Sequence, residues 1–233
     1  MKMNGIFIVG TDTDVGKTYI SALLMKKLID NNINATYYKS VLSGAYEENE
    51  NLIPGDAKYV CDISGLDEEY DHIVSYSLRT PVSPHLAAKI EGKDINLEKI
   101  KHDLNRLKDK YNFILAEGSG GIICPIKINE SETILLEDII KIAGFDVILV
   151  ARSGVGTINH TVLTVEYLKS KNINLKGIIL NEYDKKNIAH KDNAKIIEKL
   201  TNINIIAYVP KNEDNEKIKE IEINLDLDQI KSY

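Results

Sequence analysis

Short apolar runs alternate with longer helical segments along most of this chain, and this alternation limits the folds open to it. Six runs suit buried strands: Gly5–Gly10, Ala35–Lys39, Phe113–Glu117, Asp146–Ala151, Gly177–Asn181 and Asn204–Val209. Five segments between them are predicted helices: Lys17–Asn31, Ile95–Lys110, Leu135–Ala143, Ile158–Lys171 and Ala189–Leu200. Strands and helices in this order join through right-handed crossovers into a mainly parallel sheet that helices cover on both faces. The sequence therefore predicts a three-layer αβα fold of the α/β class.

Bulk properties narrow the class of protein further. The 233 residues, 43% of them hydrophobic, fit one large domain over residues 1–233, with two small domains as the weaker alternative. A net charge of -6 argues against nucleic-acid binding, which needs a basic face. No apolar run approaches the roughly 20 residues that span a bilayer, and the N-terminus lacks the features of a signal peptide. We therefore expect a cytoplasmic enzyme with no membrane partner.

The most informative motif joins the first strand to the first helix. Residues 10–18 read Gly-Thr-Asp-Thr-Asp-Val-Gly-Lys-Thr, and the closing Gly16-Lys17-Thr18 is typical of a P-loop, whose backbone N–H groups cradle phosphates. Lys17 is expected to reach the β- and γ-phosphates and the Thr18 hydroxyl to bind Mg²⁺. The leading glycine, Gly10, comes one residue earlier than the common spacing requires, with Thr11 in the usual place, which points to a subset of P-loop proteins. An ordinary strand-to-helix turn capped by Asp14 is the competing interpretation.

Two further strand ends carry charged groups. Glu117 follows four apolar residues at a strand tip, as the acid of a Walker B element does, and is a second candidate for Mg²⁺. Lys39 ends the second strand beside the hydroxyl of Ser43, and can hold a carbamate or phosphate oxygen as a point charge. Asp56 is either a helix N-cap or another oxygen ligand for the metal.

Polar groups also follow the later strands. The segment Gly154–Asn159 is glycine-rich and leads into a helix, so its N–H groups suit a carboxylate or a phosphate. Asn181 ends its strand and offers a donor and an acceptor that can read an adenine edge, although asparagine is also an ordinary turn residue there. Ser83 and Pro84 predict the start of a helix.

Taken together, these motifs resemble those of the dethiobiotin synthetase family, which has the P-loop NTPase fold. The family's phosphate loop matches residues 10–18, its Tyr-Lys-Pro-Val-x-Ser-Gly resembles residues 38–44, and its Glu-Gly-Ala-Gly-Gly resembles residues 117–121. Ser83-Pro84-His85 and Ile158-Asn159-His160 follow the same pattern in the same order. The resemblance runs from about Gly5 to Pro210, with Ser40 in place of the expected proline.

The resemblance implies a homodimeric enzyme that uses ATP, Mg²⁺ and CO₂ to convert 7,8-diaminopelargonate into dethiobiotin through a carbamate and a carbamic–phosphoric anhydride. It implies that Lys39 and Lys17 are catalytic and that Thr18, Asp56 and Glu117 arrange the metal. Implied substrate contacts are Thr13, Ser43, Gly154 and Asn159, with the substrate at the subunit interface. Implied nucleotide contacts are Asp14, Val15, Gly16, Lys17, Thr18, Tyr19, Asp56, Glu117, Gly118, Ser119, Gly120, Asn181, Glu182, Pro210, Lys211 and Asn212.

Three other functions fit parts of the sequence. Partition and septum-site ATPases share the phosphate-loop architecture, but they usually carry an extra lysine where this chain has Thr11-Asp12-Thr13. An amidoligase of the cobyrinic acid type normally needs a glutaminase domain, for which 233 residues leave no room. A non-catalytic nucleotide-binding module does not explain the lysine, hydroxyl and acids at the strand tips.

Overall fold

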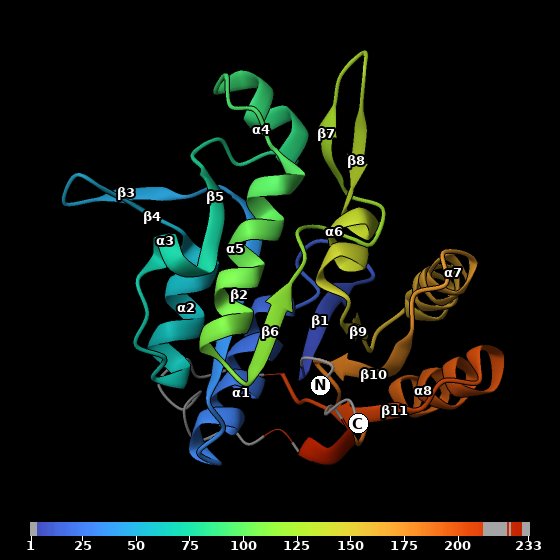
Figure 1. Ribbon diagram of the computed structural model, residues 1–233. Coiled ribbons are helices and arrows are strands. Elements are labelled where there is room, and N and C mark those ends of the chain that lie inside the picture. The colour runs from blue at the N-terminus through green and yellow to red at the C-terminus, as the bar shows by residue number, and fades with distance from the viewer. Residues whose placement is uncertain (1–3, 212–222, 224, 230–233) are drawn as a thin grey trace.

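A seven-stranded parallel sheet with helices on both faces forms the centre of the molecule, in the computed structural model that describes residues 4–211, 223 and 225–229 (Figure 1). The strands lie in the order β11-β10-β9-β1-β6-β2-β5, and all their pairings are parallel. Their bounds are β1 Asn4–Gly10, β2 Ala35–Ser43, β5 Val74–Leu78, β6 Phe113–Glu117, β9 Asp146–Arg152, β10 Leu175–Asn181 and β11 Ile205–Tyr208. The predicted α/β fold with a mainly parallel sheet is thus confirmed.

Helices and hairpins complete the fold. The helices are α1 Lys17–Asp30, α2 Gly55–Ser64, α3 Tyr70–Ile73, α4 Pro84–Ile90, α5 Leu97–Lys110, α6 Leu136–Ala143, α7 Thr157–Ser170, α8 Ile188–Thr201 and the short 3₁₀ turn η2 Leu227–Gln229. Two antiparallel pairs, β3 Tyr46–Glu48 with β4 Asn51–Ile53 and β7 Pro125–Ile128 with β8 Thr133–Leu135, project from the layers (Figure 1). Within the part of the chain that the structure describes, no helix is long and apolar enough to cross a bilayer.

The core has two halves because successive side chains of a strand point to opposite faces of the sheet. On β1, Ile6 and Ile8 pack toward α1 and α2, whereas Phe7 and Val9 pack toward α5, α6, α7 and α8. Ile223 and Leu225, from the C-terminal part, are buried with the α1 half of the core, and the Lys27 ammonium donates a hydrogen bond to the carbonyl of Ile223.

The structure corrects several predicted boundaries. The strand predicted over Ala35–Lys39 continues to Ser43, because it pairs there with β5, a strand that the alternation pattern did not predict. The predicted helix Ile95–Lys110 begins only at Leu97, since the Asn96 side chain accepts from the N–H of Glu98 and caps it. The strand predicted over Phe113–Glu117 is confirmed at both ends, and the remaining predicted elements differ by one or two residues.

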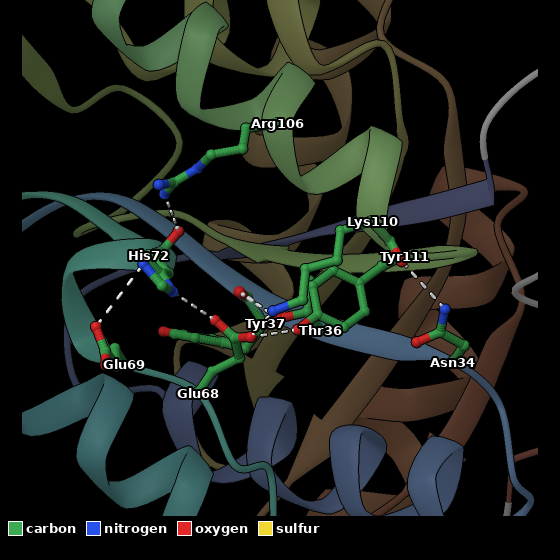
Figure 2. A network of polar contacts seen from close by, with 9 residues as sticks. All are labelled: Asn34, Thr36, Tyr37, Glu68, Glu69, His72, Arg106, Lys110 and Tyr111. Atoms are coloured by element: carbon green, nitrogen blue, oxygen red, sulfur yellow. Dashed lines mark hydrogen bonds and ion pairs between the residues drawn. The ribbon is translucent and has the colours of Figure 1, made fainter.

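A polar network fastens the loop before α3 to the end of α5 (Figure 2). Glu68 accepts from Lys110 and from the hydroxyl of Tyr111, and its second oxygen lies 3.1 Å from Nδ1 of His72. Arg106 donates to the carbonyl of His72 at 3.1 Å. These contacts hold α3 and the loop before it against α5. Because α3 leads directly into β5, they also support this edge strand of the sheet next to β2.

Gly5 tests the packing at the centre of the sheet. A Cβ atom at Gly5 would lie 2.6 Å from the ring of Phe145, which is buried. We expect Gly5→Ala to lower the free energy of unfolding by about 1–3 kcal/mol, the usual cost of overpacking a core. Urea unfolding followed by circular dichroism measures this change. Gly55→Ala is the control, because its Cβ would meet only Tyr46, at an ordinary 3.7 Å. Equal stability of Gly5→Ala and wild type would contradict this account of the packing.

Candidate active site

The loop between β1 and α1 has the backbone of a phosphate cradle. Gly16 is the N-cap of α1 in the left-handed region, with φ 94°, and a Cβ there would lie 2.1 Å from Nδ2 of Asn181. Asp14 also has a positive φ of 57°. No side chain caps the first turn of α1, so the N–H groups at this helix end stay available for an anionic ligand. The interpretation of the loop as a turn capped by Asp14 is therefore wrong.

Lys17 begins α1 and lies over the phosphate loop. Its ammonium donates to the carbonyl of Asp12 at 3.0 Å. Burial lowers the pKa of Lys17, an effect that the nearby Glu117 carboxylate partly offsets. The Lys17 side chain thus closes the loop on itself and lies where phosphates would bind.

Lys39 lies between two carboxylates at the neighbouring strand tips. β2 and β6 pair in the register that sets Lys39 opposite Glu117, and its Nζ donates to Glu117 Oε1 at 2.7 Å and to Asp56 Oδ2. Burial alone would lower the pKa of Lys39, but the Glu117 and Asp56 charges hold it above its ordinary value. Burial alone would raise the pKa of Asp56, and the Lys39 ammonium holds it below its ordinary range. The Lys39 ammonium and the Asp56 carboxylate thus each favour the charged form of the other.

Asp56 reaches this cluster from α2. The helix begins at Gly55 with Pro54 as its N-cap, so Asp56 lies in the first turn and the N-cap interpretation is wrong. Its carboxylate is turned instead toward Lys39. By contrast, Ser83 and Pro84 start α4 as predicted, although the Ser83 side chain makes no capping hydrogen bond.

Thr18 completes a set of hard oxygen donors. Its hydroxyl donates to Glu117 Oε1 at 2.9 Å, on the same carboxylate that Lys39 contacts. Within the described ranges no group of three or more His, Cys, Asp or Glu side chains gathers as a metal site. Two carboxylates and a hydroxyl are nevertheless the donors that Mg²⁺ uses when nucleotide phosphates and water supply the other ligands. The residues present fit Mg²⁺ bound together with a nucleotide.

Two adjoining pockets lie at this site, and the charged cluster lines the smaller of them. The first, about 470 Å³, is lined by Thr13, Asp14, Gly16, Lys17, Thr18, Lys39, Ser43, Asp56, Glu117, Ser119 and Gly120. The second, about 1020 Å³, extends past Pro81–Pro84 and residues 121–125 to His160 and Tyr167 on α7. They share Thr13, Asp14, Ser43, Ser119 and Gly120. A phosphate-sized group in the first pocket would therefore adjoin a larger ligand in the second.

The other predicted contacts that the structure describes do not line either pocket. Gly154 and the exposed Asn159 are not among the residues that line either pocket. Val15 and Gly118 are buried, Tyr19 is half-buried, and Glu182, Pro210 and Lys211 are exposed. Asn212 lies outside the described residues.

Asn181 contacts the phosphate loop directly. The side chain is buried, and its Nδ2 donates to the carbonyl of Val15 at 3.0 Å. Its Oδ1 is buried without a hydrogen-bond partner within the part of the chain described. A buried acceptor of this kind is costly unless a ligand supplies a donor.

Sequence reasoning missed two residues that contact this site. Arg152, at the end of β9, donates from its guanidinium to the carbonyl of Asp14 at 2.7 Å. Tyr37 donates from its hydroxyl to Glu117 Oε2 at 3.0 Å. Neither position had a motif to mark it, because each contact depends on how distant strands lie side by side.

Comparisons with known proteins agree with this geometry. A family model described as "AAA domain" matches residues 4–219. A protein of Clostridium novyi, "ATP-dependent dethiobiotin synthetase BioD", is 55% identical over 98% of this chain and 97% of its own length. The protein of the same name from Clostridium acetobutylicum is 47% identical over 95% of this chain and 93% of its own. The chain belongs to the dethiobiotin synthetase family.

Solved structures show how widely the fold is shared. The septum site-determining protein MinD with Mg-ADP from Pyrococcus horikoshii aligns with a TM-score of 0.56 and 18% identity, over 98% of this chain and 86% of that one. A ParA family ATPase from Chlorobium tepidum aligns with a TM-score of 0.54 and 16% identity, over 94% of this chain and 88% of that one. At these identities the likeness concerns the fold alone, so it does not favour a partition or septum-site role over dethiobiotin synthetase membership.

Arg152 provides a test of the phosphate loop. We expect Arg152→Ala to raise the KM for ATP roughly fivefold, because one exposed, charge-assisted hydrogen bond that fixes the loop contributes about 1 kcal/mol. The KM is measured by steady-state kinetics at varied ATP concentration. Arg152→Lys, which keeps a cationic donor, should show a smaller rise. A KM unchanged in both variants would mean that the contact to Asp14 does not order the loop.

Proposed function

We propose that this protein closes a cyclic urea on 7,8-diaminopelargonate, using CO₂ and ATP and releasing dethiobiotin, ADP and phosphate. One observation carries the proposal beyond family membership: lysines, acids and a hydroxyl from four separate elements meet in the smaller pocket, which adjoins the larger one. These residues are Lys17, Thr18, Lys39, Asp56 and Glu117.

The reaction requires that negative charge on the phosphates be neutralised and that the reacting groups be held in place. One amine of the substrate attacks CO₂ and loses a proton, which gives a carbamate. A carbamate oxygen then attacks the γ-phosphorus and ADP leaves, and the second amine attacks the carbonyl carbon and expels phosphate. Lys39 and Lys17 stabilise the negative charge that gathers on the transferring group. The Cys124 thiol in the larger pocket is not needed, and burial raises its pKa to about 11, so it is protonated at neutral pH.

Thr18, Asp56 and Glu117 are the residues we propose to hold Mg²⁺. When bound, the metal supplies positive charge at the β- and γ-phosphates. The proposal rests on the donor set: each of the three offers oxygen, and Thr18 and Glu117 are already in contact.

The nucleotide is proposed to follow the loop from Asp14 to Tyr19 and the turn from Gly118 to Gly120. Its base is proposed to lie beside Asn181, whose free Oδ1 would accept from an adenine amino group. Glu182 and the residues from Pro210 to Asn212 are the further proposed contacts on that side.

The substrate is proposed to bind in the larger pocket, with Thr13 and Ser43 at its reacting end and Gly154 and Asn159 reaching it from the neighbouring subunit of a homodimer. The position of Gly154 and Asn159 outside both pockets of their own chain supports that arrangement. We further propose a single domain over residues 1–233 and a cytoplasmic location.

A direct assay tests the activity. The purified protein, given 7,8-diaminopelargonate, bicarbonate and MgATP, is expected to form a product that has gained one carbonyl and lost the two hydrogens it replaces, detected by mass spectrometry. Lys39→Ala should lower turnover on the order of 10²–10³-fold, the usual cost of removing one preorganised charge contact.

Lys58→Ala is the control, since this lysine lies on α2 beside Asp56 but pairs with Asp62 at the surface. It should keep wild-type turnover. Full activity in folded Lys39→Ala would refute the role of Lys39. ATP hydrolysis that depends on DNA or lipid, with no diamine product, would favour a regulatory switch.

Mixing two inactive homodimers tests the shared site. Asn159→Asp places a negative charge where the substrate carboxylate is proposed to bind, and Lys39→Ala disables the other half of the site. If both subunits build each site, refolding the two variants together should restore activity to about one quarter of wild type, because half of the dimers are mixed and each has one intact site. No recovery in mixed dimers, isolated by two affinity tags, would contradict a site shared between subunits.

A further inference from the structure

Tyr37 is a fully buried tyrosine whose hydroxyl ends in the charged cluster. It lies on β2 with an exposed fraction of 0%, packed in the half of the core that contains α1 and α2. The hydroxyl donates to Glu117 Oε2 at 3.0 Å. A buried phenol needs such a partner, but here the partner is a carboxylate of the candidate metal set rather than a backbone carbonyl.

The two oxygens of Glu117 have different partners. Oε1 accepts from Thr18 at 2.9 Å and from Lys39 at 2.7 Å, whereas Oε2 accepts from Tyr37. Oε1 is thus the oxygen on the side of the phosphate loop, and Oε2 is held from the core. Rotation of the carboxylate would break the bond from Tyr37 together with those from Thr18 and Lys39.

Tyr37 can act only as a donor in this pair. Burial, followed by the Glu117 and Asp56 charges, raises the pKa of Tyr37 well above its ordinary value. The strand geometry explains its reach: Tyr37 and Lys39 are two residues apart and therefore point to the same face of the sheet. Lys39 pairs with Glu117 in the register of β2 and β6, and Tyr37 pairs with Leu115, two residues earlier on each strand. The Tyr37 ring spans this separation, so its hydroxyl reaches the Glu117 carboxylate.

We propose that Tyr37 is a positioning residue that holds the Glu117 carboxylate with Oε1 turned toward Thr18 and the phosphate pocket, and so sets the affinity of the site for divalent metal. This inference rests on the proposed function for the role of the metal. Partners that orient a metal-binding carboxylate typically change metal affinity by about 10–100-fold when they are removed.

Tyr38 supplies a matched control. It is also buried, at 1% exposed, and lies next to Tyr37 on the same strand, but it faces the opposite half of the core. Its hydroxyl contacts Ser75 Oγ at 2.7 Å and no residue of the metal set. Tyr38→Phe therefore removes a buried hydroxyl of the same kind without touching Glu117, which separates a general loss of packing from an effect on the metal.

The experiment is a Mn²⁺ titration of the full-length protein in the presence of a non-hydrolysable ATP analogue, with free Mn²⁺ measured by electron paramagnetic resonance. Tyr37→Phe should bind Mn²⁺ about 10-fold more weakly than wild type. Tyr38→Phe should bind it as wild type does. Binding of the analogue in EDTA, without metal, should be equal in all three proteins. In the turnover assay, Tyr37→Phe should need about 10-fold more Mg²⁺ for half-maximal rate.

A double-mutant cycle shows whether the effect passes through Glu117. In a Glu117→Gln background, the added Tyr37→Phe change should weaken Mn²⁺ binding by less than twofold, as expected when two residues act as one unit. Unchanged Mn²⁺ affinity in Tyr37→Phe, or an equal loss in Tyr38→Phe, would overturn the proposal. Because the titration uses no diamine, a wild-type protein that binds Mn²⁺ as expected but makes no dethiobiotin would refute the proposed function alone.

Discussion

The ammonium of Lys39, buried between the carboxylates of Glu117 and Asp56, is the interaction on which the rest of the site depends. The side chains of Lys39 and Glu117 are only 4% and 0% exposed. Such charges are stable inside a protein only when they are paired and hydrogen-bonded, because removing one partner leaves an uncompensated charge behind. The fold therefore holds these charged groups in place before any ligand binds. Because each charge needs its partner, the residues at positions 39, 56 and 117 depend on one another.

The order of the strands produces this cluster. β1, β6 and β2 are neighbours, so the phosphate loop, Glu117 and Lys39 all leave the sheet at the carboxyl ends of adjacent parallel strands. Ligands of open α/β sheets collect at that edge. α2 then adds Asp56 to the smaller pocket, and the larger pocket adjoins it at Thr13 and Ser43 and extends toward α7. The carboxyl end of the sheet thus places the phosphate pocket next to a second pocket large enough for an extended substrate.

Much of this arrangement could be predicted from the sequence, and the missing parts share a physical reason. The phosphate loop and the acid at Glu117 were visible because each depends on contiguous residues next to an apolar run. β5 was missed because three of its five residues are only partly buried, which gives no continuous apolar signal. Tyr37 and Arg152 were missed because their partners are about 80 and 138 residues away in the chain. Contacts of this kind depend on which strands are neighbours and on their register. The alternation of apolar and polar residues does not say which distant side chains will meet. The roles proposed for the site residues, Gly154, Asn159 and Asn212 among them, stay predictions.

The central claim is that this pocket transfers the γ-phosphoryl group of ATP to a carbamate formed on the diamine. In that reaction the oxygen that bridges carbon and phosphorus comes from CO₂ and leaves with phosphate when the ring closes. Bicarbonate fully labelled with heavy oxygen, used in a short incubation with the diamine and MgATP, tests this directly. Mass spectrometry of the inorganic phosphate should find one heavy oxygen for each dethiobiotin formed. Phosphate that carries only oxygen from ATP and water would mean that the γ-phosphoryl group never reached the carbamate, and would contradict the account.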